Sequence, residues 1–442
     1  MRIYNTLHRQ QEEIVPAQDK NVTTYTCGPT VYDYMHIGNL RTFVFSDVLI
    51  RALRYNGYQV KSAQNVTDID DKIIKRANEQ KKTIKEISDK YTKFFLTDIN
   101  KLNVEPPTVR PFATEYIARM VDYIKALLDK GYAYKEKDGS VYFDISKFRD
   151  YGKLSGVKKR ELKTGTRTLS DEYTKSDVQD FALWKSVPEK APGSFQTDLG
   201  WGRPGWHIEC SVMSQSVLGD EIDIHTGGVD LIFPHHENEI AQSEAKTGRK
   251  PFVKYWVHGA HMLVEGEKMS KSLNNFYTLS DIEKKGFDPL ALRYLFLQTH
   301  YRQEMNFTWE ALEAAQNALN KLRREISGFD NPRIGCAELE NDFQTAVNDD
   351  LNMPQALAVV WQVVNSDNPT SAKSESIFKF DEILGLSLKD SGKILKFREK
   401  EMPDDIKKLL IKRDILRKEK NYAEADKIRE KVIKMGYRVE DN

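Results

Sequence analysis

The sequence predicts an α/β protein in which a parallel-sheet domain is interrupted by an insertion and followed by a helical bundle and a small C-terminal region. Residues 20 to about 115 alternate apolar strand-like runs with helical patterns, and the alternation resumes from about residue 200 to residue 262. The intervening segment is richer in charged and turn residues, which indicates an insertion in the middle of the sheet. Beyond Leu290 the apolar residues recur at helical spacing. No unit repeats along the chain, which excludes a solenoid.

The composition is that of an ordinary globular protein and excludes several classes. A chain of 442 residues is too long for one core and predicts about three domains. Its net charge of +1 gives no overall attraction to nucleic acid, so any RNA contact must come from local patches. Three cysteines do not make a disulfide framework in a chain of this size, and they predict reduced thiols in a cytoplasmic protein. No signal-peptide core and no apolar run of the roughly 20 residues that cross a bilayer is expected.

The first element that carries chemistry is the junction between a strand and a helix near the N-terminus. An apolar run from Val22 to Thr26 predicts the strand, and residues Leu40 to Tyr55 have apolar side chains at helical spacing. A phosphate would lie at the N-terminus of this helix, where free N–H groups and the helix dipole favour anions. Gly38 would let a ligand approach the backbone, and His36 could donate a hydrogen bond to it.

The next elements belong to the insertion and to the second half of the sheet. A helix is expected from Ala113 to Leu128, with strands around Tyr134 and Val141. A further strand is expected from Glu221 to Ile224, and another should end at 256–259.

Glycines follow the strand expected at 221–224. Gly227 and Gly228 would admit an adenosine at this edge of the sheet, and the carboxylate of Asp230 could bind ribose hydroxyls. A Gly-Gly pair alone is more often a turn.

A second segment with nucleotide chemistry, Lys268-Met269-Ser270-Lys271-Ser272, lies more than 200 residues after the first. Its two lysines are three residues apart in a stretch rich in Gly, Ser and Asn, from Glu265 to Asn275, which suits a mobile loop that closes over a triphosphate. Each segment alone is a weak signal, whereas the pair in this order is a strong one.

Helices are expected in the C-terminal third. Thr308 can cap a helix with one apolar stripe, and Pro354 stands where the first turn of another would begin. A looser stretch, Asn365 to Ser376, should interrupt the helices. From Ile406 to Arg438 there are 12 Lys and Arg against 5 Asp and Glu, a local net charge of +7. Such a run is more often a solvated helix face than an RNA-binding surface, so charge alone decides nothing.

Histidine and glutamate at helical spacing indicate a metal site. His235 and Glu239 are four residues apart, so on a helix both can bind one ion, and His236 is also within reach. Cys27 and Cys210 are candidates for two soft ligands of a tetrahedral zinc set. Neither belongs to a Cys-x-x-Cys pair, so the residues alone leave open that both are small buried apolar side chains.

The first segment, which includes His36-Ile37-Gly38-Asn39, and the lysine segment resemble the HIGH and KMSKS signatures of class I aminoacyl-tRNA synthetases. Four more motifs are similar to those of the cysteinyl-tRNA synthetase family: Cys27-Gly28-Pro29-Thr30-Val31-Tyr32, Asn65-Val66-Thr67-Asp68-Ile69-Asp70-Asp71-Lys72, Gly205-Trp206-His207-Ile208-Glu209-Cys210-Ser211 and Gly227-Gly228-Val229-Asp230-Leu231-Ile232-Phe233-Pro234-His235-His236-Glu237-Asn238-Glu239. The likeness covers the chain to about Asn442. Asn39 departs from the final histidine of the signature. An amide still donates hydrogen bonds but carries no charge, so its contact to ATP should weaken.

The resemblance implies a domain organisation. A Rossmann-like catalytic domain would be split into 1–115 and 196–262 by a connective insertion at 116–195. The expected order then continues with a signature-loop and stem-contact region at 263–305, a helical bundle at 306–395 and an anticodon-binding tail at 396–442.

The resemblance also implies a role for individual residues. The zinc ligands would be Cys27, Cys210, His235 and Glu239. The catalytic groups would be His36, Lys268 and Lys271, and ATP, with Mg²⁺, would in addition contact Gly38, Asn39, Gly227, Gly228 and Asp230. Cysteine would contact Thr67, Trp206 and His225, although Trp206 could equally be a core aromatic. The anticodon would contact Arg417, Tyr422 and Asp426, with Tyr422 in place of the usual tryptophan.

The function that the resemblance implies is ATP-dependent activation of L-cysteine to cysteinyl-adenylate, followed by transfer to the 3′-terminal ribose of tRNA(Cys). Zinc would select the cysteine thiolate over serine, and the enzyme would be a monomer without a membrane partner. One alternative is a cysteine ligase that acts on a small amino-sugar, as in mycothiol synthesis, and the basic C-terminal segment argues against it. The other is a non-catalytic RNA-binding paralogue, which would be expected to have lost signature lysines, zinc ligands or His36.

Overall fold

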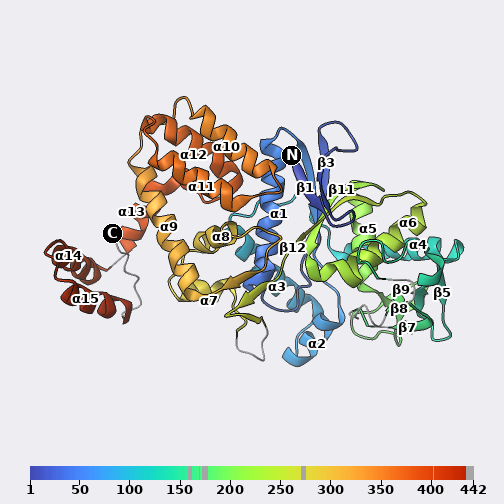
Figure 1. The fold of residues 1–442 in the computed structure, drawn as a ribbon. Coiled ribbons are helices and arrows are strands. Elements are labelled where there is room, and N and C mark those ends of the chain that lie inside the picture. Colours follow the sequence, from blue (N-terminus) through green and yellow to red (C-terminus); the bar gives the residue numbers. More distant parts are fainter. Residues whose placement is uncertain (158–161, 169, 172–177, 270–274, 402, 435–442) are drawn as a thin grey trace.

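A computed structural model of the chain describes residues 1–157, 162–168, 170–171, 178–269, 275–401 and 403–434 (Figure 1). Its centre is a four-stranded parallel sheet in the order β12-β11-β3-β4. The strands are β3 (Asn21–Thr26), β4 (Gln59–Gln64), β11 (Ile222–Gly228) and β12 (Val253–Gly259). The expected parallel α/β sheet is therefore confirmed. Within the described part of the chain, no helix is both long and apolar enough to cross a membrane.

Helices cover both faces of this sheet, and each face has its own apolar core. The helix after β3, α1 (Ile37–Tyr55), packs in one core with Tyr255 and Val257, whereas α5 (Trp206–Leu218) packs in the other with Trp256. The alternation along β12 follows from the two-residue period of a strand. The remaining helices around the sheet are α2 (Asp71–Gln80), α3 (Ile84–Lys101) and α6 (Glu237–Thr247).

The insertion forms a second sheet at one end of the molecule (Figure 1). It begins with η1 (Ala113–Tyr116) and α4 (Ile117–Asp129), as expected, and its strand order is β5-β6-β8-β10-β9 with β7 beside β8. The elements are β5 (Ala133–Lys135), β6 (Val141–Phe143), η2 (Ile145–Lys147), β7 (Leu162–Thr168), β8 (Val178–Ser186), β9 (Phe195–Thr197) and β10 (Gly200–Pro204). This sheet continues past the expected boundary at residue 195, because β10 pairs with both β8 and β9.

A small sheet of order β14-β13-β15 lies between the parallel sheet and the C-terminal helices. It contains β13 (Met262–Val264), β14 (Glu267–Lys268) and β15 (Met305–Phe307), while β1 (Arg2–Asn5) and β2 (Gln10–Glu13) form a separate hairpin. The helices that follow are α7 (Leu279–Lys284), α8 (Pro289–Leu297), α9 (Trp309–Ser327), α10 (Ala337–Asn348), α11 (Met353–Asn365), α12 (Thr370–Leu384), η6 (Leu388–Asp390), α13 (Ser391–Glu401), α14 (Asp404–Lys418) and α15 (Tyr422–Lys434).

The expected helix starts are confirmed, and one expected break is wrong. Thr308 accepts a hydrogen bond from the Ala311 N–H at the start of α9, and Pro354 lies in the first turn of α11. The break expected over residues 365–376 covers only 366–369, because α12 already begins at Thr370. The polar residues in the first half of α12 are compatible with the helix because they are buried with hydrogen-bond partners. The Ser376 hydroxyl donates to Glu340 and accepts from the Cys336 N–H at 2.7 Å.

A buried ion network joins the sheet to the helical bundle. Asp47, on α1, is 2.6 Å from Arg293 Nη2 and 2.8 Å from Arg51 Nε through the same carboxylate oxygen. Arg293 also donates to the carbonyls of Leu384 at 2.6 Å and Leu102 at 2.9 Å. Charges at this depth need a full set of partners, so α1, α8 and the end of α12 are held in one arrangement.

Replacement of Arg293 by Ala should destabilise the protein by about 3–5 kcal/mol, because the Asp47 carboxylate and several carbonyls lose a buried donor. Urea unfolding monitored by tryptophan fluorescence measures this change: the first unfolding transition of the variant should occur at a lower urea concentration than that of the wild type. The control is Lys393→Ala, which removes an exposed pair with Asp390 and should leave the transition in place. Equal transitions for the two variants would contradict the role of Arg293.

Candidate active site and metal cluster

The expected site residues lie along the carboxyl ends of the central strands. Cys27 directly follows β3, and the Asn65 to Thr67 segment follows β4. The backbones approach closely here: a Cβ at Gly28 would lie 1.6 Å from the Asn65 carbonyl oxygen, and the Gly28 N–H donates to Asn65 Oδ1 at 2.7 Å. Only glycine fits at position 28, which fixes Cys27 beside the neighbouring strand.

The four expected zinc ligands converge in the structure. Their ligand atoms lie within 4.8 Å of one another, and all four side chains are buried. Cys27 Sγ is 3.8 Å from Cys210 Sγ, and Glu239 Oε1 is 3.8 Å from Cys27 Sγ and 3.1 Å from His235 Nε2. Two sulfurs, one imidazole and one carboxylate form a donor set that zinc accepts.

The local backbone around His235 differs from the expected continuous helix. His235 belongs to a π-helical turn, η5 (Ile232–His236), in which Phe233 has an extended conformation, and Glu239 lies in the first turn of α6. The two ligands still meet because η5 leads directly into α6. His235 Nε2 is directed at the Glu239 carboxylate, and a buried nitrogen in this position fits a metal ligand.

Further histidines surround the cluster. His207 Nδ1 is 3.0 Å from His235 Nδ1, and His258 Nε2 is 2.8 Å from His236 Nδ1, so each pair fixes a ring orientation. A second group, Cys27, His225, His236 and Glu239, also has its ligand atoms within 4.8 Å. The group with two sulfurs matches the soft ligands of zinc better.

The protonation of the cluster opposes metal binding at low pH. Burial raises the pKa of Cys27, and the neighbouring Cys210 and Glu239 raise it further. Burial lowers the pKa of His235, but Glu239 and Cys210 outweigh this effect and raise it to about 10. At neutral pH Cys27 is therefore a thiol and His235 an imidazolium, and both must lose a proton before they bind a cation.

The segment His36-Ile37-Gly38-Asn39, here called the nucleotide signature, contains a hydrogen-bond donor with a defined proton position. His36 is the N-cap of α1, and its Nδ1 accepts the Asn39 N–H at 3.1 Å. Burial lowers the pKa of His36 to about 4, against a smaller opposite effect of Asp230. The imidazole is therefore neutral at pH 7 and carries its proton on Nε2, which can donate to a phosphate oxygen.

The structure brings the two signatures together. A Cβ at Gly38 would lie 3.0 Å from His36 Nδ1 and 3.7 Å from Met269 Cε, and the Ile37 N–H donates to the Tyr277 carbonyl at 2.9 Å. Lys268 is exposed at the end of β14. Lys271 lies outside the described residues.

The glycines at 227 and 228 are the last residues of β11, which is longer than the strand expected at 221–224. A Cβ at Gly227 would lie 2.7 Å from His236 Cε1, and one at Gly228 would lie 2.3 Å from Asp230 Oδ1. The glycines therefore let His236 and Asp230 pack against the end of the strand.

The residues expected to contact cysteine adjoin the metal cluster. Trp206 stacks on His235 with ring centroids 4.2 Å apart, and His225 Nε2 is 3.1 Å from Glu239 Oε2. Thr67 donates to Glu209 at 2.9 Å, and Glu209 and Trp206 both line a polar hollow of about 260 Å³. Trp206 is only half-buried, so the alternative of a core aromatic does not describe it.

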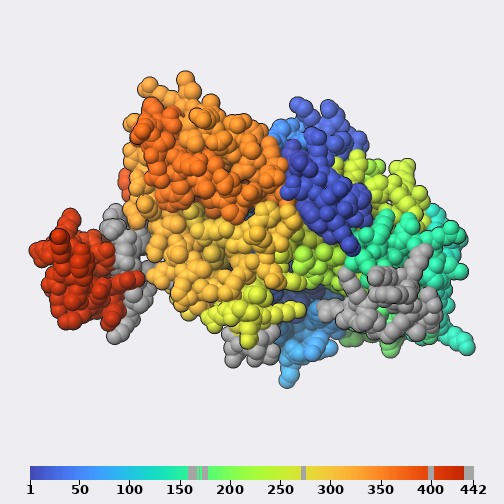
Figure 2. All heavy atoms as spheres, in the orientation of Figure 1, coloured from blue at the N-terminus to red at the C-terminus, as the bar shows by residue number. Residues whose placement is uncertain are grey.

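The residues expected to contact the anticodon lie on one helical hairpin. Helices α14 and α15 pack through Ile406, Ile428 and Val432, and Figure 2 shows the hairpin as a separate lobe at the opposite end of the molecule from the insertion. Tyr422 is 57% exposed at the start of α15, and Asp426 is also exposed, whereas Arg417 is half-buried in the last turn of α14.

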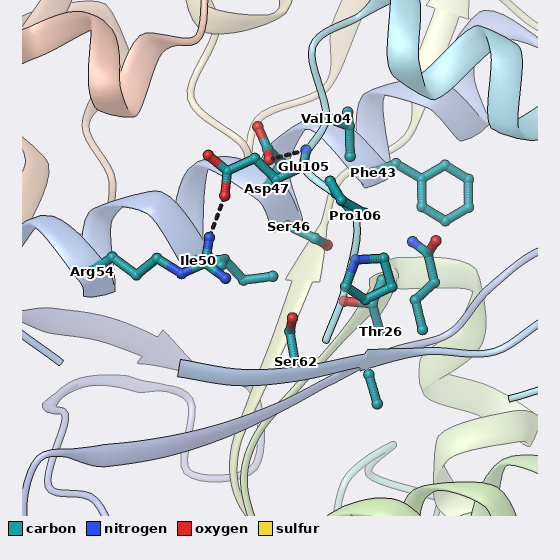
Figure 3. A pocket seen from close by; sticks show the side chains of 13 residues that line it. Thr26, Phe43, Ser46, Asp47, Ile50, Arg54, Ser62, Val104, Glu105 and Pro106 are labelled. Carbon is teal, nitrogen blue, oxygen red and sulfur yellow. Dashed lines mark hydrogen bonds and ion pairs between the residues drawn. The ribbon is translucent and has the colours of Figure 1, made fainter. Parts of the chain in front are cut away.

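Another hollow, of about 370 Å³, lies between α1 and strands β3 and β4 (Figure 3). Thr26, Ser46 and Ser62 line it, and the Arg54–Glu105 ion pair lies at its rim. None of the expected site residues lines this hollow, and its Asp47 carboxylate belongs to the ion network.

Several residues of the site had not been expected from the sequence. His207 and His258 orient cluster histidines, and Glu209 binds Thr67. A signal was available for His258, because a polar residue at the carboxyl end of a parallel strand commonly faces a ligand. For His207 and Glu209 the signal was their position within the motif around Cys210.

The fold and the site define a class I aminoacyl-tRNA synthetase. The family model described as tRNA synthetases class I (C) catalytic domain matches residues 13–317. Two solved structures share the fold: a Mycobacterium tuberculosis methionyl-tRNA synthetase with methionyl-adenylate (TM-score 0.57, 14% identity, 85% of this chain and 93% of that one), and an Agrobacterium radiobacter LeuRS-tRNA-LeuAMS complex (TM-score 0.61, 10% identity, 86% and 85%).

Proteins similar in sequence show to which family within this class the chain belongs. A Cysteine--tRNA ligase of Chlamydia felis is 43% identical over 100% of this chain and 96% of its own length. A Cysteine--tRNA ligase of Leptospira interrogans is 44% identical over 100% of this chain and 97% of its own length. The chain belongs to the cysteinyl-tRNA synthetase family.

Zinc affinity should rise with pH, by about a hundredfold per unit between pH 7 and 8, because Cys27 and His235 each release a proton. Isothermal titration in buffers of different ionisation enthalpy measures the proton release, and metal analysis gives the stoichiometry. Cys210→Ser should lose the ion, whereas Cys336→Ser, which changes the one cysteine outside the cluster, should retain it. A pH-independent affinity would contradict this ligand set.

Proposed function

We propose that this protein activates L-cysteine with ATP and Mg²⁺ to cysteinyl-adenylate and transfers the cysteinyl group to the 3′-terminal ribose of tRNA(Cys). The observation that carries the proposal is the cluster of two cysteines, a histidine and a glutamate close to Gly227, one of the residues expected to contact ATP. The link between them is short: Gly227 packs against His236, whose Nε2 is 3.4 Å from Cys27 Sγ. The full-length likeness to proteins named Cysteine--tRNA ligase supports the same reaction.

The cluster would serve amino-acid selection. Cysteine and serine differ by one atom, and a pocket that measures size discriminates weakly between such substrates. The four side chains would hold one zinc ion, which when bound would favour a thiolate over a neutral hydroxyl. Two cysteinates and a glutamate exceed the charge of Zn²⁺ by one, and the hydrogen bond from His225 to Glu239 would draw off part of that excess.

The remaining groups would position ATP and stabilise charge. The cysteine carboxylate attacks the α-phosphorus and pyrophosphate leaves, so negative charge develops on phosphate oxygens. His36 Nε2–H, the N–H groups at the start of α1, and Lys268 and Lys271 would stabilise this charge. Asp230 would hold the ribose. In the second step the 2′-OH of the terminal tRNA ribose would attack the adenylate carbonyl and release AMP.

The two alternative functions are tested in the same assay as the proposal. ATP–pyrophosphate exchange with cysteine but not serine, together with charging of tRNA(Cys), is the expected result. Exchange without charging would favour the amino-sugar ligase, and absence of exchange would favour the RNA-binding paralogue. The monomeric state and the cytoplasmic location stay predictions.

Lys271→Ala should lower kcat of exchange by about 10²-fold and change KM for ATP little, because its contact is proposed to strengthen in the transition state. Steady-state exchange kinetics give both constants. Lys284→Ala, an exposed lysine on α7, is the matched control. Equal effects on kcat and KM would refute a role confined to the transition state.

Tyr422→Ala should weaken tRNA charging by about tenfold and leave cysteine-dependent exchange intact, because an exposed ring that stacks on an unpaired base contributes about 1–3 kcal/mol. Charging at varied tRNA concentration measures the change, and Tyr422→Phe, which keeps the ring, should behave as wild type. A parallel fall in exchange would indicate a structural role instead.

A further inference from the structure

Arg41, on α1, is a buried cation whose partners are backbone carbonyls. Its Nη1 donates to the carbonyls of Ala260 and His261, both at 3.1 Å, and its Nη2 donates to those of His300 at 3.1 Å and Gln303 at 2.8 Å. Among the described residues no carboxylate pairs with it. Burial of a charge without a counterion destabilises the folded protein, and the four hydrogen bonds offset this cost. In return, Arg41 ties together the backbone segments that carry these carbonyls.

The four carbonyls belong to the two segments from which the small sheet starts. Ala260 and His261 immediately precede β13, and His300 and Gln303 precede β15. The segments also bond to each other, through the Ala260 N–H to the Tyr301 carbonyl at 2.8 Å. Arg41 therefore holds the point at which β13 and β15 begin to pair, and its planar fork is suited to several acceptors in a way that a lysine is not.

This sheet carries one end of the lysine segment. Lys268 pairs with Leu263 of β13, so the position of Lys268 follows that of β13. The chain that follows the lysine segment is bound to the start of α1. The Ile37 N–H donates to the Tyr277 carbonyl, and His36 pairs with Thr278. Arg41 supplies the second connection, five residues after His36 on the same helix.

We propose that Arg41 is a positioning residue: it sets the place of Lys268 relative to His36, and through it the rate of adenylate formation. The proposal rests on the proposed function, in which both groups stabilise the reacting phosphates. A misplacement of about 1 Å in such a site can cost about 10²-fold in rate. In this scheme Arg41 itself does not contact the phosphates of ATP.

The surroundings of Arg41 allow a direct chemical test. A hollow of about 340 Å³ adjoins the side chain, with mostly apolar walls that include Phe45 and Phe296. If the side chain is shortened, an added guanidinium ion can occupy the position between the carbonyls. Arg54, an exposed arginine on the same helix that pairs with Glu105, is the control because it contacts neither the small sheet nor Asp47.

The experiment measures ATP–pyrophosphate exchange of the zinc-loaded full-length chain. Arg41→Ala should lower kcat about 10- to 100-fold with KM for ATP within about threefold, and millimolar guanidinium chloride should restore at least a third of the loss. In a Lys268→Ala background, Arg41→Ala should cost less than about twofold, because the group that it positions is gone. Arg54→Ala should leave kcat close to that of the wild type and should not respond to guanidinium.

Two results would overturn the role of Arg41 while leaving the proposed function in place: additive losses in the Arg41→Ala, Lys268→Ala double variant, or no response to guanidinium, with wild-type exchange intact. Wild-type protein that lacks cysteine-dependent exchange would overturn both. If Arg41→Ala does not fold, Arg41→Lys carries the test, since it keeps the charge but cannot bond four carbonyls. It should show the same non-additivity with Lys268→Ala.

Discussion

The buried carboxylate of Asp47 is the interaction on which the arrangement of the molecule depends. One carboxylate lies between two guanidiniums, those of Arg51 and Arg293, and the excess positive charge is taken up by backbone carbonyls from two other segments, 102–103 and the end of α12. No member can leave without uncovering a charge that water cannot reach, so the network is retained or lost as a unit. Because α1 carries Asp47 and has His36 as its N-cap, the same network that joins the bundle to the sheet also fixes the direction of the helix at whose start the nucleotide signature lies.

The cluster of candidate metal ligands imposes the second constraint, and it acts on the opposite face of the sheet. Its ligands come from the end of β3, from α5 and from the junction of η5 and α6, which the insertion separates in sequence. Both cysteines belong to the core that contains Trp256, whereas α1 belongs to the core that contains Tyr255 and Val257. Under the proposed function the amino-acid site and the ATP site are therefore built on different cores, and they meet only at the carboxyl ends of β3 and β11. The glycines at 28 and 227 are needed there because the strands and side chains approach more closely than any Cβ allows.

Local sequence patterns predicted the parts of the fold that local physics determines. The parallel strands, the cap at Thr308 and the helix of the insertion follow from apolar spacing and capping chemistry. The cap at His36 was not expected, and α1 begins at Ile37, three residues before the helix predicted from Leu40. The break expected at 365–376 was wrong because Ser376 of α12 is buried, where its hydroxyl donates to Glu340 and accepts from the Cys336 N–H, some 40 residues away. The convergence of Cys27 with Cys210 could be anticipated only through family resemblance, since no spacing rule connects residues 183 positions apart. Arg41 could not be anticipated at all, because its partners are carbonyls, and every residue has one.

The protonation of His36 decides how the proposed reaction can use charge. A neutral imidazole adds no permanent positive charge where ATP binds, so the fixed part of the site would consist of dipoles: the His36 Nε2–H and the N–H groups at the start of α1. The positive charge of the proposed ATP site would then come from Lys268 and Lys271. A site divided in this way would hold the bound substrate with dipoles and reserve the lysine charges for the phosphates of the transition state, which would favour the transition state over the bound substrate. For such a division the distance between His36 and Lys268 matters more than the strength of either contact, and the two connections of the lysine segment to α1 are what determine it.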